Sequence, residues 1–502
     1  MSVLAKLNRP AAHAPTPATS MLARFNRPVV AVLLVGLIAG YVRFVHLGYP
    51  EHRVFDEYYY TKSACIYLDY SNERCDINSA DERFWRENEW DTGAWVHPPL
   101  GKLMIAAGEL AFGTESFGWR AGAAVAGTAT VMLLAVIIQL LFASPIWTFA
   151  GGLLLATESL NVVQSRTGTL DVFLAFWIVL GLLFLLLDRR WIERRTPWPP
   201  PRSEPEEGPL EETPVGSPPR FPSPLWRPYR FAAGAAMGGA MAVKWSGLTG
   251  VATAIVLAFG WEAVRRKRFG MRHPIRDAFV SEGFGLVVFL MVVPAIVYTA
   301  TYTGWFIHFD WDLAKWIDVH GKSARFHADL DALNERGEPW HAYFSPAWQW
   351  ILLRRPVYYY ADYSTEGIRQ VIYANGNPAI FWGAILAIPY VAYAWWRKRD
   401  WRAGFVVVAI AGLYLPWFLV SRPQFLFYAT PITPFLVLAC VYALRNLSEL
   451  RVAGSRSRPY LPVAVGYVAL SVMLFAWFWP ILTGGPLTDA AFKLRYWFTT
   501  WV

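Results

Sequence analysis

Charged residues and cysteines are scarce in this chain of 502 residues, and both shortages limit what it can be. Only 17% of the residues are charged, whereas a soluble protein carries about a quarter. The three cysteines form no CxxC pair, and there is no HExxH or metal-finger spacing. No basic stretch is interleaved with a soluble binding module, so the net charge of +9 is weak evidence for nucleic acid. A soluble protein, a metal-finger domain and a nucleic-acid partner are therefore not expected.

Apolar and aromatic residues are abundant instead. Hydrophobic residues make up 55% of the chain, which contains 26 Trp and 24 Tyr. Such aromatics are typical of belts at the two membrane interfaces. The sequence predicts an all-α polytopic membrane protein with about 11 spans, at 28–47, 118–141, 146–165, 168–187, 231–245, 246–263, 279–303, 378–395, 403–420, 425–444 and 461–481.

The spans divide the chain into segments of different character. We expect a disordered cytoplasmic tail at 1–27, followed by spans 1–4 in 28–187 with an external loop at 48–117. A Pro-rich cytoplasmic linker at 188–230 leads to spans 5–7 in 231–303. A second external loop at 304–377 precedes spans 8–11 and an external C-terminus in 378–502. Leu100–Phe112 is too short to span and is expected to lie along the interface as an amphipathic helix. The first apolar run shows no cleavage pattern and is expected to remain as an anchor.

The distribution of basic residues predicts the orientation. With the amino terminus in the cytoplasm, the basic stretches 188–230, 264–276, 396–402 and 445–458 all face inward, which agrees with the positive-inside rule. Both large loops then face outward. We therefore expect a multi-pass protein of the plasma membrane with its functional groups on the extracytoplasmic side.

Polar and ionisable residues gather at this outer membrane level. They are Asp56, Glu57, Glu158, Gln164, Arg166, Asp171, Lys244 and Arg422. Ionisable groups at a membrane boundary are costly to desolvate and usually have a task. A transporter would place them near the midplane, in broken helices. The clustering favours an enzyme that acts at the outer leaflet.

Five motifs in consistent order, from about residue 28 to 445, resemble the protein O-mannosyltransferases. They are Phe55-Asp56-Glu57 with His97-Pro98-Pro99-Leu100-Gly101-Lys102, the block Glu158-Ser159-Leu160 to Gln164-Ser165-Arg166 with Leu170-Asp171, Lys244-Trp245-Ser246-Gly247, Ile372 to Pro378, and Leu415-Pro416-Trp417. Residues 304–377 are too short for the β-trefoil domain of the eukaryotic members. The last two motifs resemble the actinobacterial branch.

This resemblance implies a fold of the glycosyltransferase C type. It also implies transfer of mannose, with inversion, from a polyprenyl-phosphate carrier to Ser or Thr of exported proteins. The residues themselves offer no convincing set of metal ligands: Asp56 with Glu158 or Asp171 is the one pair that could in principle hold a divalent ion, and we expect no divalent metal and no certain cofactor. The protein export machinery is a further expected partner. Two alternatives stay open, a transferase of this fold with another sugar or acceptor and, less favoured, a transporter of lipid-linked sugars.

Asp56 resembles the catalytic base of the family, and Glu57 its neighbour. A Ser or Thr hydroxyl is a poor nucleophile until a positioned base takes its proton. A second acid beside the first raises one of the two proton affinities. Glu57 either orients the acceptor or the base, or only caps the helix that follows it.

The lipid phosphate gains charge as it leaves, so nearby cations would stabilise the transition state. The candidates are Arg166 and Lys244, which lie in family-like motifs, and Arg120 and Arg422. For Arg120 and Arg422, snorkelling at the interface is an equally good explanation.

Other residues are expected to support the site. His97 precedes two prolines and either contacts the sugar or caps the next helix, and Asp171 either pairs with Arg166 or complements a helix dipole. Glu158 and Gln164 belong to the family-like block. Several aromatics either line an acceptor groove or anchor the interface: Tyr58, Tyr59, Tyr358, Tyr359, Tyr360 and Trp350.

Cys65 and Cys75 share one external loop. In an oxidising compartment they would form a disulfide, and two unrelated free thiols are the alternative. Cys440 lies in an apolar segment and is interpreted as a packing residue.

Overall fold

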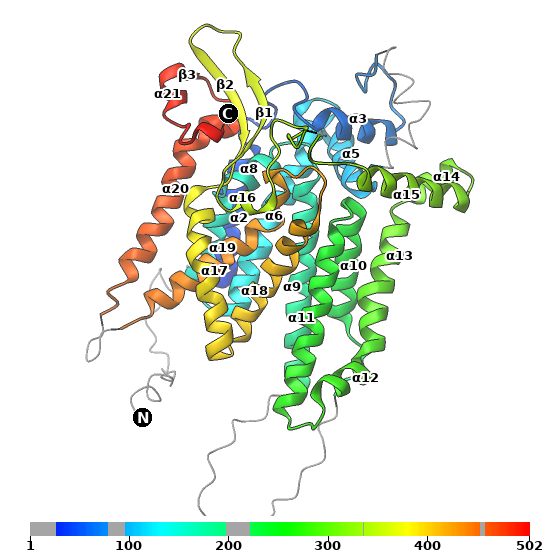
Figure 1. The fold of residues 1–502 in the computed structure, drawn as a ribbon, viewed down its shortest axis with the longest axis vertical. Coiled ribbons are helices and arrows are strands. Elements are labelled where there is room, and N and C mark those ends of the chain that lie inside the picture. The colour runs from blue at the N-terminus through cyan, green and yellow to red at the C-terminus, as the bar shows by residue number, and fades with distance from the viewer. Residues whose placement is uncertain (1–26, 79–95, 197–220, 335, 452–456, 502) are drawn as a thin grey trace, which may run out of the picture.

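The computed structural model describes residues 27–78, 96–196, 221–334, 336–451 and 457–501. Long helices form a bundle, and short helices and a β-hairpin cover one end of it (Figure 1). The predicted tail at 1–27 and most of the predicted linker at 188–230 lie outside the described residues. We call the covered end, where α3, α5 and the hairpin lie, the loop end of the bundle.

Helices occupy each of the predicted spans. Their bounds are α2 Pro28–Phe44, α6 Ser116–Phe142, α7 Pro145–Ala156, α8 Ser159–Ser165, α9 Asp171–Arg195, α10 Pro228–Val243, α11 Gly247–Arg268, α12 Pro274–Val287, α13 Val293–Ala300, α17 Pro378–Lys398, α18 Trp401–Tyr414, α19 Thr433–Ser448 and α20 Leu461–Thr483. Within the described residues, seven helical segments are long and apolar enough to cross a membrane. The bent pair α7–α8 makes an eighth if it is one span, and α2 and α19 are shorter apolar helices. The protein is thus a mostly helical, multi-pass membrane protein, and the count of about eleven stays a prediction.

One span is bent at a break and another contains a π-helical turn, each for a local reason. The axes of α7 and α8 differ by 65°, where Glu158 accepts hydrogen bonds from the backbone N–H groups of Leu160 and Asn161 and so starts a new helix. Between α12 and α13 the chain forms a π-helical turn, Val288–Val292, followed closely by Pro294. Proline lacks an N–H, and π-turns relieve such interruptions.

Short helices lie at the loop end. They are α3 Glu57–Tyr67, α5 Leu100–Phe112, α14 Thr303–His308, α15 Leu313–Ala328, α16 Ala347–Trp350 and α21 Asp489–Lys493. The helix predicted at Leu100–Phe112 is confirmed with those bounds. It packs closely on α6, because a Cβ atom on Gly108 would lie 2.4 Å from the carbonyl oxygen of Gly118.

The prediction of an all-α protein is wrong in one region. Residues Val357–Asp362 (β1) and Ile368–Ala374 (β2) form an antiparallel hairpin, and Leu487–Thr488 (β3) pairs with β2. Buried and part-exposed residues alternate at the start of β1, so the aromatic run at 358–360 follows a strand pattern. From the sequence, these aromatics were expected in the external loop 304–377, where they would line an acceptor groove or anchor the interface.

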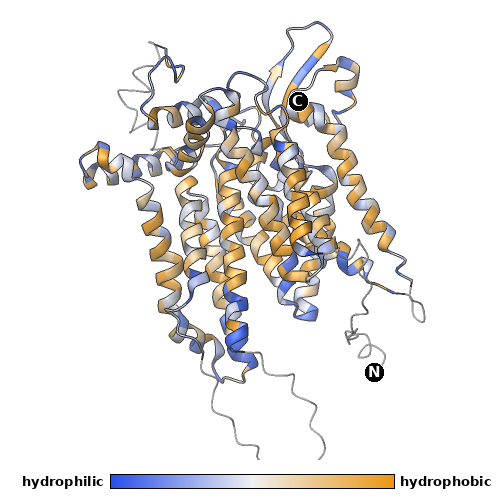
Figure 2. Cartoon of the chain, turned by 180° about the vertical axis from the view of Figure 1, so that it is seen from behind, coloured by the Kyte–Doolittle hydropathy of each residue, from blue (hydrophilic) through white to orange (hydrophobic). Residues whose placement is uncertain are grey.

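At the other end of the bundle, several helices end in hydrophilic residues, as the lower part of Figure 2 shows. Basic residues occupy the last turns of α9, α11, α17 and α19. Five buried side chains join α9 to α12 there in a network of ion pairs: Asp188, Arg227, Arg230, Glu262 and Glu282. We call this the basic end of the bundle.

Candidate active site

Asp56 lies in a tight turn just before α3, at the loop end. Phe55 has a φ of 48°, a left-handed conformation that a bulky residue rarely adopts. The ring of Phe55 stacks on Tyr359 of β1 at 4.3 Å, and Glu57 accepts a hydrogen bond from the backbone of Val54 at 3.0 Å. These contacts hold the turn and so fix the backbone that carries Asp56.

Glu57 is fully buried and forms a two-pronged ion pair with Arg120 of α6. Nε and Nη2 of Arg120 donate to the two carboxylate oxygens, each at 2.8 Å. Nη1 and Nη2 also donate to the carbonyls of Leu47, Pro50 and His52. Glu57 further accepts from the backbone of Gly168 at 2.8 Å. Both side chains are therefore used within the fold, where they join the Asp56 turn to α6.

The carboxylate of Asp56 is half-buried and has a perturbed proton affinity. Burial raises its pKa to about 6, and the neighbouring charge of Asp171 adds to the rise. Lys244 and a hydrogen bond from Tyr60 lower the pKa in part. Asp56 is thus mostly ionised at neutral pH and is still basic enough to take a proton.

Lys244 lies between α10 and α11 and pairs with Asp171 at the start of α9. Its Nζ is 3.1 Å from both carboxylate oxygens and 4.5 Å from the ring centre of Tyr428. The pair is largely buried. The predicted pairing of Asp171 with Arg166 is wrong, because Lys244 takes that place.

Further cations and histidines surround this pair. The His97 ring stacks on His327 at 5.7 Å, and His327 Nδ1 lies 2.8 Å from Nη1 of Arg422. Burial lowers the pKa of His97 well below its usual value, and the charges of Lys244, His327, Lys102 and Arg422 lower it further. His97 is therefore neutral, and it marks a region of positive potential next to Asp56.

Arg166 does not lie in this cationic region. Its Nη1 and Nη2 groups donate to four carbonyls at the end of α2, those of Val42, Arg43, Val45 and His46. Its guanidinium thus satisfies carbonyls that a helix end leaves without partners.

Glu158 and Gln164 are both fully buried and support the site from behind. Besides capping α8, Glu158 accepts from the backbone of Asn377 at 3.0 Å. Gln164 donates to the hydroxyl of Tyr359 at 2.5 Å and accepts from Thr169 at 2.7 Å. Tyr359 is thereby held between Gln164 and Phe55, beside the turn that carries Asp56.

Three residues that lie near Asp56, His97 or Lys244 were not assigned to the site from the sequence: Tyr60, His327 and Tyr428. Tyr60 adjoins the motif, but a run of three tyrosines is also typical of an interface belt. His327 and Tyr428 come from segments far along the chain, and no local spacing connects them to Asp56. Within the described residues, no three His, Cys, Asp or Glu side chains form a candidate metal site.

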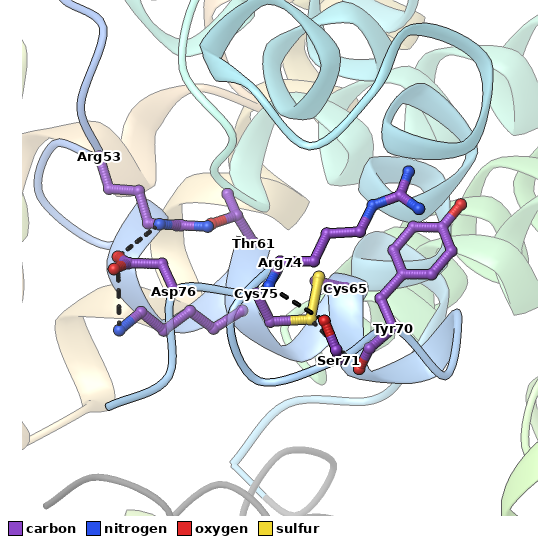
Figure 3. The surroundings of a disulfide bond; sticks show 9 residues. Arg53, Thr61, Cys65, Tyr70, Ser71, Arg74, Cys75 and Asp76 are labelled. Carbon is purple, nitrogen blue, oxygen red and sulfur yellow. Dashed lines mark hydrogen bonds and ion pairs between the residues drawn. A yellow bond between two sulfur atoms is a disulfide. The ribbon is translucent and has the colours of Figure 1, made fainter. Parts of the chain in front are cut away.

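A disulfide closes the segment after α3. Cys65 and Cys75 are bonded at 2.10 Å, and Figure 3 shows Asp76 next to them, reaching Arg53. Arg53 Nη1 lies 2.8 Å from Asp76, and its Nε donates to Thr61 of α3 at 2.7 Å. The disulfide thus joins α3 to the loop that follows it, and the Arg53–Asp76 ion pair joins that loop to the segment before Asp56. Cys440 is free and buried.

Comparison with known proteins relates this arrangement to one family. The family model described as dolichyl-phosphate-mannose-protein mannosyltransferase matches residues 33–198, and the model of the C-terminal four-span region of protein O-mannosyltransferase matches residues 312–501. The polyprenol-phosphate-mannose–protein mannosyltransferase of Mycolicibacterium smegmatis is 31% identical over 93% of this chain and 92% of its own length. The Mycobacterium tuberculosis protein of the same name is also 31% identical, over 93% of this chain and 91% of its own.

Solved structures share the fold at low sequence identity. The Saccharomyces cerevisiae protein O-mannosyltransferase complex Pmt1–Pmt2, bound to the sugar donor, covers 97% of this chain and 93% of its own with a TM-score of 0.69 at 15% identity. ArnT from Cupriavidus metallidurans in the apo state covers 93% of this chain and 77% of its own with a TM-score of 0.51 at 16% identity. The two matching family models and the 31% identity over nearly the whole length lead to one conclusion: the chain belongs to the protein O-mannosyltransferase family.

Proposed function

We propose that the protein transfers mannose from polyprenyl-phosphate-mannose to Ser or Thr hydroxyls of exported proteins, with Asp56 as the general base. The observation that carries the assignment is the half-buried carboxylate of Asp56, with a pKa of about 6, beside the Lys244–Asp171 pair. A base with a pKa near the working pH is the most effective one.

In this mechanism, Asp56 accepts the proton of the acceptor hydroxyl while the hydroxyl oxygen bonds to C1 of mannose. The bond between C1 and the phosphate oxygen breaks, and the lipid phosphate leaves with both electrons. Attack from the face opposite the leaving group inverts the configuration at C1. No metal ion is part of the proposal.

The leaving phosphate needs a positive charge close to its oxygens. We assign this role to Lys244, with Arg422 as a second cation, because the charge of Lys244 acts on Asp56 and the charges of both cations act on His97. Among the described residues, Nε of Arg422 makes no hydrogen bond. Arg120 and Arg166 are assigned to structure, as is Glu57, because their polar groups are used inside the fold.

The location of the disulfide supports the proposed orientation. Disulfides form in oxidising compartments outside the cytoplasm, and Cys65–Cys75 lies at the loop end together with Asp56. The basic end would then face the cytoplasm, as the positive-inside rule requires. Contact with the export machinery would bring acceptors to this side.

The test compares purified wild type with Asp56→Asn. Transfer of mannose from polyprenyl-phosphate-mannose to a Ser/Thr/Pro-rich peptide is expected to fall by about two to four orders of magnitude in the variant. Asp69→Asn is the matched control, because Asp69 is an exposed acid just past the same helix.

Donor binding is measured in parallel by retention of the lipid. Normal transfer by Asp56→Asn would overturn the base assignment. Donor binding without transfer by the wild type would instead point to another acceptor.

A further inference from the structure

A large cavity lies at the basic end, and Asp56 does not line it. It has a volume of ≈ 910 Å³ and is bounded by α9, α11, α17 and α18. None of the proposed catalytic residues lines it. Since α11 begins just after Lys244 and has 22 residues, the two ends of this helix are about 33 Å apart.

The wall of the cavity changes in character along α11. Val256 and Val264 present apolar side chains that are 57% and 47% exposed. Gly260 lies between them, and a Cβ atom there would meet nothing within 4 Å. This part of the wall is therefore open and apolar.

The mouth of the cavity is aromatic and cationic. Its cations are Arg189, Lys267, Arg268 and Arg399, and the residues that line the cavity include no carboxylate. The Arg189 guanidinium lies 4.1 Å from the ring centre of Trp401, and Trp395 and Trp396 are 42% and 65% exposed. Tryptophans beside basic groups are typical of the headgroup level of a bilayer.

We propose that this cavity binds an anionic phospholipid of the leaflet opposite the active site. The phosphate would lie at Lys267, Arg268 and Arg399, and the acyl chains would lie along Val256 and Val264. Basic pockets between helices on the cytoplasmic side bind anionic lipid headgroups by this combination of charge and apolar surface.

Other occupants fit less well. Free phosphate would leave the apolar wall uncovered, and a neutral lipid would offer no negative charge to Lys267 and Arg399 at the mouth of the cavity. A donor lipid with its phosphate at Lys244 cannot reach these cations with the same group. The sequence between α9 and α10 contains five acids whose negative charge would suit the cations of the cavity but which have no apolar part to cover its wall: Glu204, Glu206, Glu207, Glu211 and Glu212.

The experiment uses the full chain, delipidated in a neutral maltoside detergent. Binding of phosphatidylglycerol is measured by native mass spectrometry and by the shift of the unfolding temperature. Phosphatidylcholine with the same acyl chains, inorganic phosphate and a polyprenyl phosphate are the comparison ligands. One phosphatidylglycerol is expected to bind with clear preference over phosphatidylcholine, and inorganic phosphate is expected to give no comparable stabilisation.

Two variants test the site, each with a matched control. Lys267→Gln with Arg399→Gln should weaken phosphatidylglycerol binding roughly 30-fold, since each basic residue near an anionic lipid contributes about a factor of five. Arg397→Gln with Lys398→Gln removes the same charge from the adjacent turn, outside the lining, and should retain binding.

Gly260→Trp fills the apolar part and should abolish binding. Gly466→Trp is its control, because Gly466 also faces open space and lies on α20, away from the cavity.

Four results would overturn the proposal. They are equal binding of both phospholipids, full stabilisation by inorganic phosphate alone, selective binding of polyprenyl phosphate, and phosphatidylglycerol binding that appears only after the five linker glutamates are changed to glutamine. The last result would show that the linker, and not a lipid, occupies the cavity.

Discussion

At the scale of single residues, two adjacent acids have opposite surroundings. Glu57 is neutralised by Arg120 and by two backbone N–H groups. Asp56 is half-buried and has only part of its charge offset, by Lys244 and Tyr60. An acid that is fully paired cannot take a proton readily, so the geometry supports Asp56 alone as the base.

The raised pKa of Asp56 makes activity dependent on pH. The base must be ionised, so kcat/KM is expected to fall about tenfold per pH unit below about 6 and to level off above it. The free energy of unfolding depends on pH in the opposite sense. The carboxyl of Asp56 holds its proton up to about pH 6 in the folded protein but only to about pH 4 in the unfolded chain. The contribution of Asp56 to stability is therefore full below about pH 4 and is lost as the pH rises to about 6.

The measurement is a pH–rate profile with a saturating lipid donor. A profile that is flat between pH 5 and 7 would contradict the assignment of Asp56. Asp69→Asn should reproduce the wild-type profile.

Glu57→Gln and Lys244→Gln are expected to fail in different ways. Glu57→Gln leaves the buried guanidinium of Arg120 without its counter-charge, and such a loss costs about 3–5 kcal/mol of stability. Lys244→Gln leaves the largely buried Asp171 without its partner and should also lower stability, but it removes the cation proposed for the leaving phosphate as well and should therefore lower kcat in the protein that remains folded. Thermal unfolding and kcat are measured on both variants, and a stable Glu57→Gln protein with lost activity would mean that Glu57 acts in the chemistry.

The sequence was most informative where chemistry is local. The adjacent acids, Lys244 and the position of Asp171 were found from short motifs, and the structure places all of them near one another. The roles of Arg120 and Arg166 were not predictable in this way, because their partners are Glu57 and the end of α2, on other elements. An arginine at a helix end has the same local sequence whether it binds a ligand or satisfies buried carbonyls.

At the scale of elements, the disulfide fixes α3 to the loop that follows it. Double replacement of Cys65 and Cys75 by Ser is expected to lower stability by about 3 kcal/mol, because a loop with a sequence separation of 10 is no longer closed in the unfolded chain. Thermal unfolding checks this value. In a denatured, unreduced sample one thiol should react, that of Cys440, and a count of three would contradict the disulfide.

The helices were predictable from apolar runs because each span must satisfy its own backbone hydrogen bonds. The hairpin was not. Its pairing connects residues 357–374 with 487–488, and such long-range pairing leaves no periodic signal in either segment. Its first strand was further obscured because tyrosines are common both in strands and at membrane interfaces.

At the scale of the whole molecule, the orientation can be tested on intact cells. Glu366→Cys places a thiol on the exposed turn of the hairpin, and Arg272→Cys places one on an exposed turn at the basic end. A membrane-impermeant maleimide is expected to label Glu366→Cys only, and both variants after permeabilisation. Labelling of Arg272→Cys alone in intact cells would reverse the proposed topology.

The buried ion network at the basic end has a consequence for how the protein is put together. Asp188 lies before residues 197–220 in the sequence, and Arg227 and Arg230 lie after them. Both arginines pair with Asp188, and α9 packs along α10. The two parts of the polypeptide are thus joined by buried ion pairs and helix packing in addition to their peptide connection. The protein should therefore be divisible: two separately synthesised fragments, cut between residues 197 and 220, have the complementary charges to find each other in the membrane and form one enzyme.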